Sequence, residues 1–376
     1  MMQRSLCKIS FGKRLFGTAM KHSVFGNPLT VLASEQINVA TDKIKGNEVV
    51  LKFLGAPINP SDLNMVEGVY GTTPKLPAVG GNEGVAVVTS VGADVKKLAI
   101  GDWVIPFSSG FGCWRTEAVA REDELIKVAN DIPFPYAATL AINPSTAYRL
   151  LRDFEQLSPG DVIIQNGANS MVGLAVIQMA RNMGVKTINV VRSDRPRADL
   201  TLQLLSNLGG DVNILDCQLN APFLRDILAE LPPCKLAFNC VGGETTTEMA
   251  RCLAPGGTLV TYGGMSRRTL TLPAELLTYK QLKVKGFWIA ASDEERGIEA
   301  KQEMINEIVD MIRQKQLAFF YEVHDFDDFN HALERCLTPF LLRKVVLNID
   351  YPDRLAEHDA KMLKKKHYWK FEAPMV

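Results

Sequence analysis

The sequence predicts an α/β protein with two domains, one built on antiparallel strands and one on a parallel sheet covered by helices. With 376 residues, 47% of them hydrophobic and 22% charged, the chain has enough apolar material for two cores. From Val24 to about Tyr148, short β-branched runs are broken by turn residues, which is typical of antiparallel strands. After Pro159 and Gly160, strand-like runs alternate with segments of helical period, which indicates βαβ units.

In the first domain, turns rich in glycine and proline separate the predicted strands. Pro57, Pro60, Pro74 and Pro77 divide the stretch between two of these strands, so we expect a long irregular loop that carries Tyr70. Loops of that length usually have a function. The runs that predict strands are NEVVLKFLGAPINPSD, GVAVVTSVGADV, GDWVIPF and WRTEAVA.

In the second domain, the first strand run, IIQN, is apolar without alternation, as expected when helices cover both faces of a parallel sheet. We expect helices over residues 245–253 and 294–316, and we assign the late strand KVVLNI back to the first domain. The other predicted strands are TINVVR, VNILD, KLAFNC, TLVTYG and LKVKGFW.

Charge and composition exclude several classes of protein. Lys plus Arg and Asp plus Glu both number 42, so there is no large basic field to hold nucleic acid. Charges, glycine or proline interrupt every apolar run before the roughly 18 residues needed to span a bilayer. The seven cysteines contain no C-x-x-C pair, which favours reduced, structural thiols over a disulfide scaffold or a zinc ribbon.

The two ends of the chain are basic. Residues 1–20, MMQRSLCKISFGKRLFGTAM, combine bases, serine and isolated apolar residues with no acid, which predicts a mitochondrial transit peptide and a mature protein in the matrix. A frayed basic terminus is the alternative interpretation. The C-terminal stretch HDAKMLKKKHYWKFEAPMV is interpreted as a solvated tail.

The turn from Gly167 to Gly173, GANSMVG, lies between the first predicted strand and the first helix of the second domain. Such a turn directs backbone N–H groups and the positive end of a helix toward a pyrophosphate. A serine, Ser170, occupies the position where the dinucleotide pattern has a third glycine. The evidence for a dinucleotide site therefore comes mainly from the position of this turn between a strand and a helix. The alternative is a small-residue turn that binds nothing.

The end of the next strand discriminates between the two nicotinamide cofactors. An NAD site normally presents a carboxylate there, whereas a 2′-phosphate requires arginine. The segment VVRSDRPR supplies Arg192, Arg195 and Arg197, and a guanidinium matches a phosphate, so the sequence predicts NADPH. Asp194 is the one residue in this segment that does not fit an NADPH site. A solvated loop is the alternative interpretation of the arginines.

Several strings together resemble the medium-chain dehydrogenase/reductase superfamily and, within it, the mitochondrial trans-2-enoyl thioester reductases. They are INPSDLN, VYGTTPKLPAVGGNEGVA, GDWVIP, WRTEAV, NPSTAYR, DFEQL, PGDVIIQN, INVVR, NCVGG, TYGGM and KGFW. The resemblance implies a doubly wound Rossmann domain over residues 149–319. This domain is inserted in a GroES-like, mostly antiparallel catalytic β domain over residues 21–148, completed by residues 320–376.

The superfamily contains zinc enzymes and zinc-free ones, and the residues favour the second group. A catalytic zinc needs three Cys, His or carboxylate ligands. In alcohol dehydrogenases a Cys begins the loop that starts here at Asn59, and a His occupies the position of Asn82, so we expect no metal. Asp62 and Glu83 are interpreted as structural hydrogen-bonding residues.

The resemblance implies NADPH-dependent reduction of the C2=C3 bond of trans-2-enoyl thioesters, carried on acyl carrier protein or CoA, in mitochondrial fatty acid synthesis. It places the proton donor at Tyr70, and a phenol with a pKa near 10 can protonate an enolate carbon. Packing is the alternative role for this tyrosine. A zinc-free quinone or alkenal reductase is the alternative enzyme, and a cofactor-binding protein without turnover is the non-enzymatic one.

The resemblance also implies a homodimer and further contacts to the cofactor. Trp288 as core filler and Lys344 as a surface charge are the alternatives for two of these residues. The residues carried over to the cofactor site are Asn143, Asn169, Ser170, Met171, Val172, Arg192, Ser193, Asp194, Arg195, Tyr262, Gly263, Gly264, Met265, Phe287, Trp288, Ile289 and Lys344.

Overall fold

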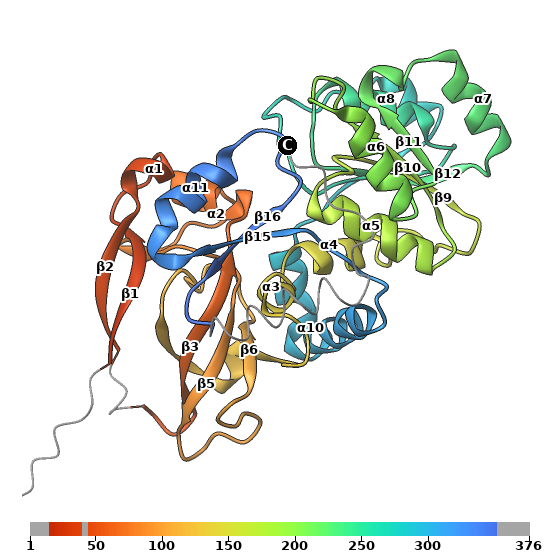
Figure 1. Ribbon diagram of the computed structural model, residues 1–376. Coiled ribbons are helices and arrows are strands. Elements are labelled where there is room, and N and C mark those ends of the chain that lie inside the picture. Colours follow the sequence, from red (N-terminus) through yellow and green to blue (C-terminus); the bar gives the residue numbers. More distant parts are fainter. Residues whose placement is uncertain (1–14, 40–43, 352–376) are drawn as a thin grey trace, which may run out of the picture.

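The computed structural model describes residues 15–39 and 44–351, which fold into two lobes (Figure 1). The first lobe combines the N-terminal strands with the C-terminal elements β15, β16 and α11, and the second contains the middle of the chain. The chain therefore leaves the first lobe, builds the second and returns.

The first lobe is the β domain, with a three-stranded sheet in the order β2-β1-β4 and a seven-stranded sheet in the order β15-β16-β3-β5-β6-β8, where β7 pairs with β3. Strand β16 runs parallel to β15 and antiparallel to β3, so the late part of the chain completes this domain. The strands are β1 (Leu15–His22), β2 (Ala33–Val39), β3 (Glu48–Pro57), β4 (Ala78–Val79), β5 (Val85–Val91), β6 (Trp103–Pro106), β7 (Glu117–Arg121), β8 (Leu125–Val128), β15 (Tyr321–Asp325) and β16 (Lys344–Asn348).

Trp114 fixes the glycine pair that precedes β5. Its ring is fully buried, and its Nε1 donates a hydrogen bond to the carbonyl of Pro57 at 3.0 Å. A Cβ on Gly80 would lie 2.4 Å from this ring, and Gly81 has a φ of +93°, so neither position accepts a side chain. Trp114 therefore connects the glycine pair that precedes β5 to the end of β3.

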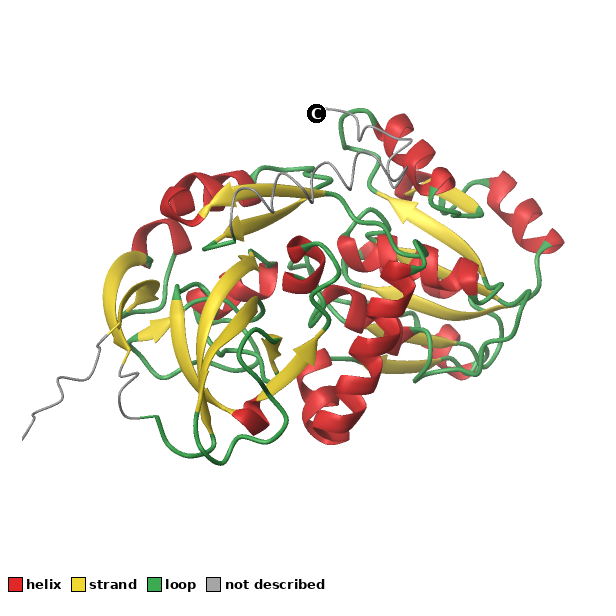
Figure 2. Cartoon of the chain, turned by 60° about the horizontal axis from the view of Figure 1, so that its bottom comes forward, coloured by secondary structure: helices red, strands yellow, loops and turns green. Residues whose placement is uncertain are grey.

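The second lobe is a six-stranded parallel sheet in the order β11-β10-β9-β12-β13-β14, wound in both directions from the central strand β9. Figure 2 shows helices on both faces of this sheet, and every residue of β9 is buried. The predicted doubly wound Rossmann fold is thus confirmed. Its strands are β9 (Val162–Asn166), β10 (Lys186–Val191), β11 (Val212–Leu215), β12 (Cys234–Asn239), β13 (Thr258–Thr261) and β14 (Lys283–Gly286), and its helices are α5 (Met171–Asn182), α6 (Ala198–Asn207), α7 (Pro222–Glu230), α8 (Glu244–Cys252), α9 (Ala274–Thr278) and α10 (Ile289–Arg313).

The stretch before Tyr70 is less irregular than predicted, because α2 (Pro60–Glu67) occupies its first part. Asn59 precedes the helix, Pro60 opens it, and Asp62 accepts a hydrogen bond from the backbone N–H of Asn59 at 2.6 Å. These starting signals outweigh the prolines around them. The other helices are α1 (Pro28–Val31), α3 (Phe134–Ala138), α4 (Asn143–Leu150) and α11 (Phe329–Leu337), with 3₁₀ turns η2 (Glu122–Glu124), η3 (Asp216–Gln218) and η4 (Phe326–Asp328).

The expected domain boundary at Met20 falls inside β1. Ala19 is fully buried and Met20 is 4% exposed, and both residues pair with β2. A cleavage site after Met20 would remove most of this strand, so the structure favours a boundary before Leu15. The preceding residues 1–14 of the expected transit peptide and the basic C-terminal tail lie outside the described residues.

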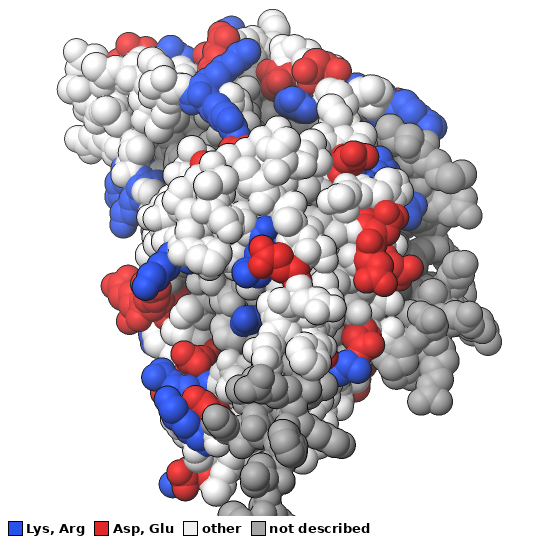
Figure 3. All heavy atoms as spheres, turned by 90° about the vertical axis from the view of Figure 1, so that its left-hand side faces the viewer, with Lys and Arg blue, Asp and Glu red and all other residues white. Residues whose placement is uncertain are grey.

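On the face of the β domain seen in Figure 3, acidic and basic side chains are interspersed rather than gathered by sign. This surface matches the balanced composition of the chain. Among the described residues, no helix is both long and apolar enough to cross a membrane.

Helix α10 connects the two lobes. It starts earlier than predicted and is interrupted at Gly297, whose φ of 84° and ψ of 175° are not helical. Asp293 before the interruption and Lys301 after it form a buried ion pair at 2.8 Å, and Lys301 also donates to the carbonyl of Phe107 at 2.6 Å. The pair therefore joins both halves of α10 to the loop that follows β6.

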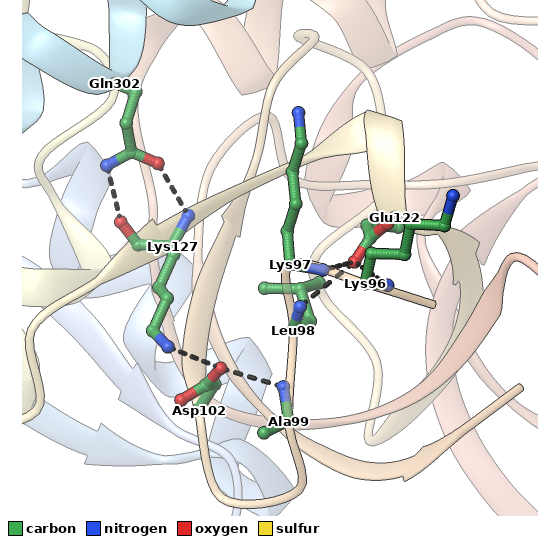
Figure 4. Close-up of polar contacts among 8 residues, drawn as sticks. All are labelled: Lys96, Lys97, Leu98, Ala99, Asp102, Glu122, Lys127 and Gln302. Carbon is green, nitrogen blue, oxygen red and sulfur yellow. Dashed lines mark hydrogen bonds and ion pairs between the residues drawn. The ribbon is translucent and has the colours of Figure 1, made fainter. Parts of the chain in front are cut away.

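The second half of α10 is also attached to β8, the edge strand of the large sheet (Figure 4). The side-chain amide of Gln302 accepts from the backbone N–H of Lys127 at 3.1 Å and donates to its carbonyl at 2.8 Å. Nearby, the Glu122 carboxylate accepts the backbone N–H groups of Lys96 and Leu98, in the turn before β6. Asp102 pairs with the Lys127 ammonium at 2.7 Å. The edge of the β domain is thus bound directly to a helix of the second lobe.

Candidate functional site

A pocket of about 710 Å³ lies at the carboxyl end of the parallel sheet, where the strand order reverses on either side of β9. Ligands of doubly wound sheets bind at this place. The pocket is lined by the ends of β9 and β10, by the segments that follow β11 and β12, and by Met265, Ser266 and Arg268 after β13.

The glycine turn forms the link from β9 to α5. Gly167 lines the pocket with a φ of +59°, and the Ser170 hydroxyl caps α5 by accepting from the N–H of Gly173 at 3.1 Å. A Cβ on Gly173 would lie 2.5 Å from the carbonyl oxygen of Ala168, so the close contact between turn and helix requires glycine there. Asn169, Ser170, Met171 and Val172 lie in this turn and the start of α5, beside the pocket lining.

Two buried asparagines, Asn166 and Asn239, hold the pocket floor together. The Oδ1 of Asn239 accepts from Asn166 Nδ2 at 2.8 Å, from the N–H groups of Val241 and Gly242 at 3.1 and 3.0 Å, and from the Thr246 hydroxyl at 2.7 Å. This carbonyl oxygen therefore sets the turn after β12. Neither asparagine is predicted as a site residue, although each is the last residue of its strand.

The end of β10 presents Arg192, Ser193 and Asp194 to the pocket, as predicted for a group that binds the adenosine end of a dinucleotide. Arg192 is exposed and lies 3.7 Å from Asp194, a loose ion pair, while Asp216 fixes the loop by accepting from the N–H of Ser193 at 2.9 Å. Arg268 lines the same pocket and was not predicted. Two guanidinium groups thus border one cavity.

Arg195 lies away from the pocket lining. Its side chain is 6% exposed, its guanidinium stacks on the Phe340 ring, and it donates to the Phe340 carbonyl at 3.1 Å. Burial lowers the pKa of Arg195. Its visible role in this structure is to attach the loop after β10 to the segment before β16.

Trp288 of the second lobe and Tyr70 of the β domain contact each other. The indole Nε1 of Trp288 donates to the Tyr70 hydroxyl oxygen at 2.8 Å, and the two rings stand edge to face with centroids 5.6 Å apart. Burial raises the pKa of Tyr70, which favours the protonated phenol. A Cβ on Gly71 would lie 3.3 Å from the Trp288 ring, so glycine leaves room for this contact.

Beneath this pair lies a buried polar network centred on Asn59. Its Oδ1 accepts from Asn143 Nδ2 at 3.0 Å and from the Lys344 ammonium, and its Nδ2 donates to Glu83 at 2.8 Å. The second Glu83 oxygen accepts from the N–H of Ile142 at 2.9 Å, next to the start of α4. Asn143 and Lys344, both predicted as cofactor contacts, therefore belong to one hydrogen-bonded unit.

Asp62 completes this Asn59 network from α2. Besides the Asn59 N–H, its carboxylate accepts the N–H of Asn82 at 2.7 Å. Burial raises the pKa of Asp62 to about 6 and that of Glu83 to about 7, and it lowers the pKa of Lys344. Both carboxyl groups thus act in structural hydrogen bonds, as the sequence analysis expected.

The remaining predicted residues lie in the segment after β13 and around the start of α10. Met265 is 60% exposed at the pocket, whereas Tyr262 has a buried hydroxyl near Cys240 and Ser170, and burial raises its pKa. Phe287 packs against Phe154, and Ile289 is buried at the start of α10. Gly263 and Gly264 lie in the segment between Tyr262 and Met265.

Comparison with known proteins identifies the family. Residues 45–130 match the alcohol dehydrogenase GroES-like domain, and residues 172–308 match the zinc-binding dehydrogenase domain. The chain is 49% identical over 326 residues to the mitochondrial enoyl-[acyl-carrier-protein] reductase of Xenopus tropicalis, covering 86% of this chain and 92% of that one. The human protein of the same name is 46% identical over 332 residues, with 88% of each chain covered. This chain belongs to the mitochondrial enoyl-[acyl-carrier-protein] reductase family.

Solved structures agree with membership of the enoyl reductase family. The Etr1p/NADP/crotonyl-CoA complex superimposes with a TM-score of 0.83 at 31% identity, covering 89% of this chain and 100% of the other. The Etr1p/Etr2p heterodimer of Candida tropicalis, a mitochondrial 2-enoyl thioester reductase, gives the same TM-score at 32% identity and the same coverage. A quinone reductase fold from Bacillus thuringiensis has a TM-score of 0.80 at 27% identity over 89% of this chain and 100% of that one.

The raised pKa of Glu83 predicts how stability depends on pH in this reductase. The folded protein keeps the Glu83 proton up to a pKa of about 7, whereas the ordinary value is 4.5. As pH rises from about 4.5 to about 7, the unfolded chain releases a proton that the folded chain retains, so this group lowers the free energy of unfolding by about 3 kcal/mol. Glu83→Gln removes this contribution, and urea unfolding at pH 5 and pH 8 measures it. If the free energies of unfolding of the wild type and of Glu83→Gln changed by the same amount between pH 5 and pH 8, the raised pKa of Glu83 would be contradicted.

Proposed function

We propose that this protein reduces the C2=C3 bond of trans-2-enoyl thioesters with NADPH, and that Tyr70 donates the proton. The observation that carries the proposal is the Trp288–Tyr70 hydrogen bond, which joins a phenol of the β domain to a residue of the cofactor domain. Family membership supports the reaction class, and the Etr1p complex with NADP and crotonyl-CoA supports the substrate class.

The pocket at the carboxyl end of the parallel sheet fits NADPH. Arg192 and Arg268 supply positive charge for a 2′-phosphate, and the turn after Gly167 offers backbone N–H groups and a helix start for the pyrophosphate. An NAD site presents a carboxylate at the end of this strand, whereas the first residue after β10 here is Arg192. We expect Asn143, which is held by Asn59, and Trp288 to contact the nicotinamide end of the cofactor.

The reaction requires one hydride at C3 and one proton at C2 of the thioester. The chemistry that NADPH supplies when bound is the hydride, and the electron pair of the C2=C3 bond then moves onto C2 and the thioester oxygen as an enolate. Tyr70 gives its hydroxyl proton to C2, which completes the saturated thioester, and the phenol recovers a proton from solvent. No second acid is needed for this balance.

Trp288 prepares Tyr70 for that transfer. Because the indole N–H occupies one lone pair of the phenol oxygen, the hydroxyl hydrogen is directed away from the indole. The same N–H remains in place to stabilise the phenolate after proton transfer. Burial keeps the phenol protonated until a stronger base, the enolate carbon, is formed.

The exposed edge of the Rossmann sheet supports a homodimer. All residues of β14 are exposed, and the strand pairs only with β13 within the described chain. Val284 in β14, with Leu277 and Tyr279 in the preceding segment, adds apolar surface to this edge, with exposed fractions of 42%, 45% and 83%. Two copies can join such edges around a twofold axis and satisfy their backbone groups.

The protein is assigned to mitochondria, like its relatives, and we place an import signal before β1. Cleavage between residues 1 and 14 leaves the pairing of β1 with β2 intact. The N-terminal mass of the mature protein tests this position, since a start after Leu15 would remove part of β1.

Tyr70→Phe is expected to lower kcat by about 100-fold to 10,000-fold for a trans-2-enoyl thioester, because the acid is lost while the ring remains. NADPH binding, followed by the quenching of protein or nicotinamide fluorescence, should stay close to wild type. A variant that reduces at the full rate would refute Tyr70 as the donor. Wild-type NADPH binding without turnover, or turnover of quinones and alkenals only, would refute the enoyl reductase assignment.

Arg192→Ala is expected to raise the KM for NADPH by about 10-fold to 100-fold, because a charged hydrogen bond to the 2′-phosphate is lost. The KM for NADH should change little, and Arg225→Ala on the exposed face of α7 serves as the matched control. Equal losses with both dinucleotides would contradict a role in recognising the 2′-phosphate.

Val284→Pro is expected to prevent pairing of β14 edges, because proline removes a backbone donor and does not fit a paired strand. Sedimentation equilibrium should then report a monomer, whereas the wild-type protein should sediment as a dimer. A wild-type monomer at micromolar concentration would contradict the homodimer.

A further inference from the structure

Two histidines and an aspartate converge on the β domain, outside the lining of the cofactor pocket. His324 comes from β15, Asp328 ends the 3₁₀ turn η4, and His331 follows on α11. One ligand atom from each of the three lies within 4.8 Å of the other two. We propose that His324, Asp328 and His331 form a binding site for a borderline divalent cation of the Zn²⁺ type.

One of the distances among these groups is close to that of a zinc site, and the others lie within 4.8 Å. Bonds of about 2.0–2.1 Å in a tetrahedral arrangement place ligand atoms about 3.4 Å apart. The Nδ1 of His331 lies 3.1 Å from an oxygen of Asp328. Both side chains are more than 60% exposed, so small rotations can bring them onto an ion.

His324 is the more rigid member of the site. Its side chain is 11% exposed, and its Nε2 lies 3.0 Å from a Glu322 oxygen. That oxygen also accepts from Arg335 Nε at 2.8 Å. Because an oxygen that faces the Arg335 guanidinium is an acceptor, the proton of His324 belongs on Nε2.

This arrangement leaves Nδ1 of His324 with the lone pair that a metal ion requires. A histidine that donates its other nitrogen to a carboxylate is the usual arrangement around protein-bound zinc. Glu322 thus acts behind the ligand, orienting the ring, and Arg335 in turn orients Glu322. Three side chains supply ligands, and water completes the tetrahedron.

The donor set indicates which ions fit. Two imidazoles and one carboxylate suit Zn²⁺ and its transition-metal neighbours, whereas Ca²⁺ and Mg²⁺ require mainly oxygen ligands. The site connects the edge strand β15 to α11, which are also linked by the Arg335–Glu322 hydrogen bond and by packing on β16. A bound ion would therefore brace the C-terminal part of the β domain, and it is independent of the reductase reaction proposed above.

The test uses the untagged full-length protein, stripped with a chelator and dialysed. Calorimetric titration with Zn²⁺ is expected to show a site that His331→Ala abolishes and that Glu322→Gln weakens about 10-fold to 100-fold. Glu334→Gln on the same helix is the matched control and should bind as wild type, because Glu334 is exposed and lies outside the cluster. Zn²⁺ should also raise the Tm of the wild type but not of His331→Ala.

Cobalt substitution distinguishes this site from others in the chain. Co²⁺ in a tetrahedral site of nitrogen and oxygen ligands gives visible absorption bands, and we expect them in the wild type and in Glu334→Gln only. The proposal would be overturned if His331→Ala matched the wild type in both the Zn²⁺ titration and the Co²⁺ spectrum. It would also be overturned if the wild-type protein showed no Zn²⁺ site. Because His331 is exposed, its variant should fold, and unchanged reductase activity without Zn²⁺ verifies this.

Discussion

The site depends on the buried hydrogen bonds around Asn59. They join the start of α2, the start of β5, the start of α4 and the start of β16, which come from both ends of the chain. Burying a polar group is costly unless it is hydrogen-bonded, and here Glu83 and Asp62 each accept two donors close to the Lys344 ammonium. The cost of burial is thus offset by contacts that also fix Asn143 and the helix leading to Tyr70.

The Tyr70–Trp288 hydrogen bond requires both domains at once. Tyr70 follows a helix of the β domain, and Trp288 stands at the point where β14 of the Rossmann sheet leads into α10. Neither domain alone can hold the phenol oxygen against the indole N–H. The attachments of α10 to Phe107 and Lys127 hold the two domains together and thereby maintain the geometry of this hydrogen bond.

Local patterns in the sequence were sufficient for the fold and for much of the site. The strand and helix periods predict both sheets, and the turn from Gly167 and the arginine after β10 predict the cofactor end. The role of Arg195 could not be predicted, because its partner Phe340 is far along the chain. Arg268 and Asn239 were missed for the same reason, since only the folded sheet brings their loops together. The helix α2 was not predicted, because the prolines around it indicated a loop and outweighed the capping residue at its start.

The interruption of α10 leaves its two parts joined by the backbone and by one ion pair. Gly297 adopts a backbone conformation that side chains disfavour, and it separates the short segment that follows Trp288 from the long segment bound to β8. Asp293 and Lys301, both buried, bridge this break at 2.8 Å. The orientation of the indole relative to the edge of the β domain therefore rests on two opposite charges in place of continuous helical hydrogen bonds.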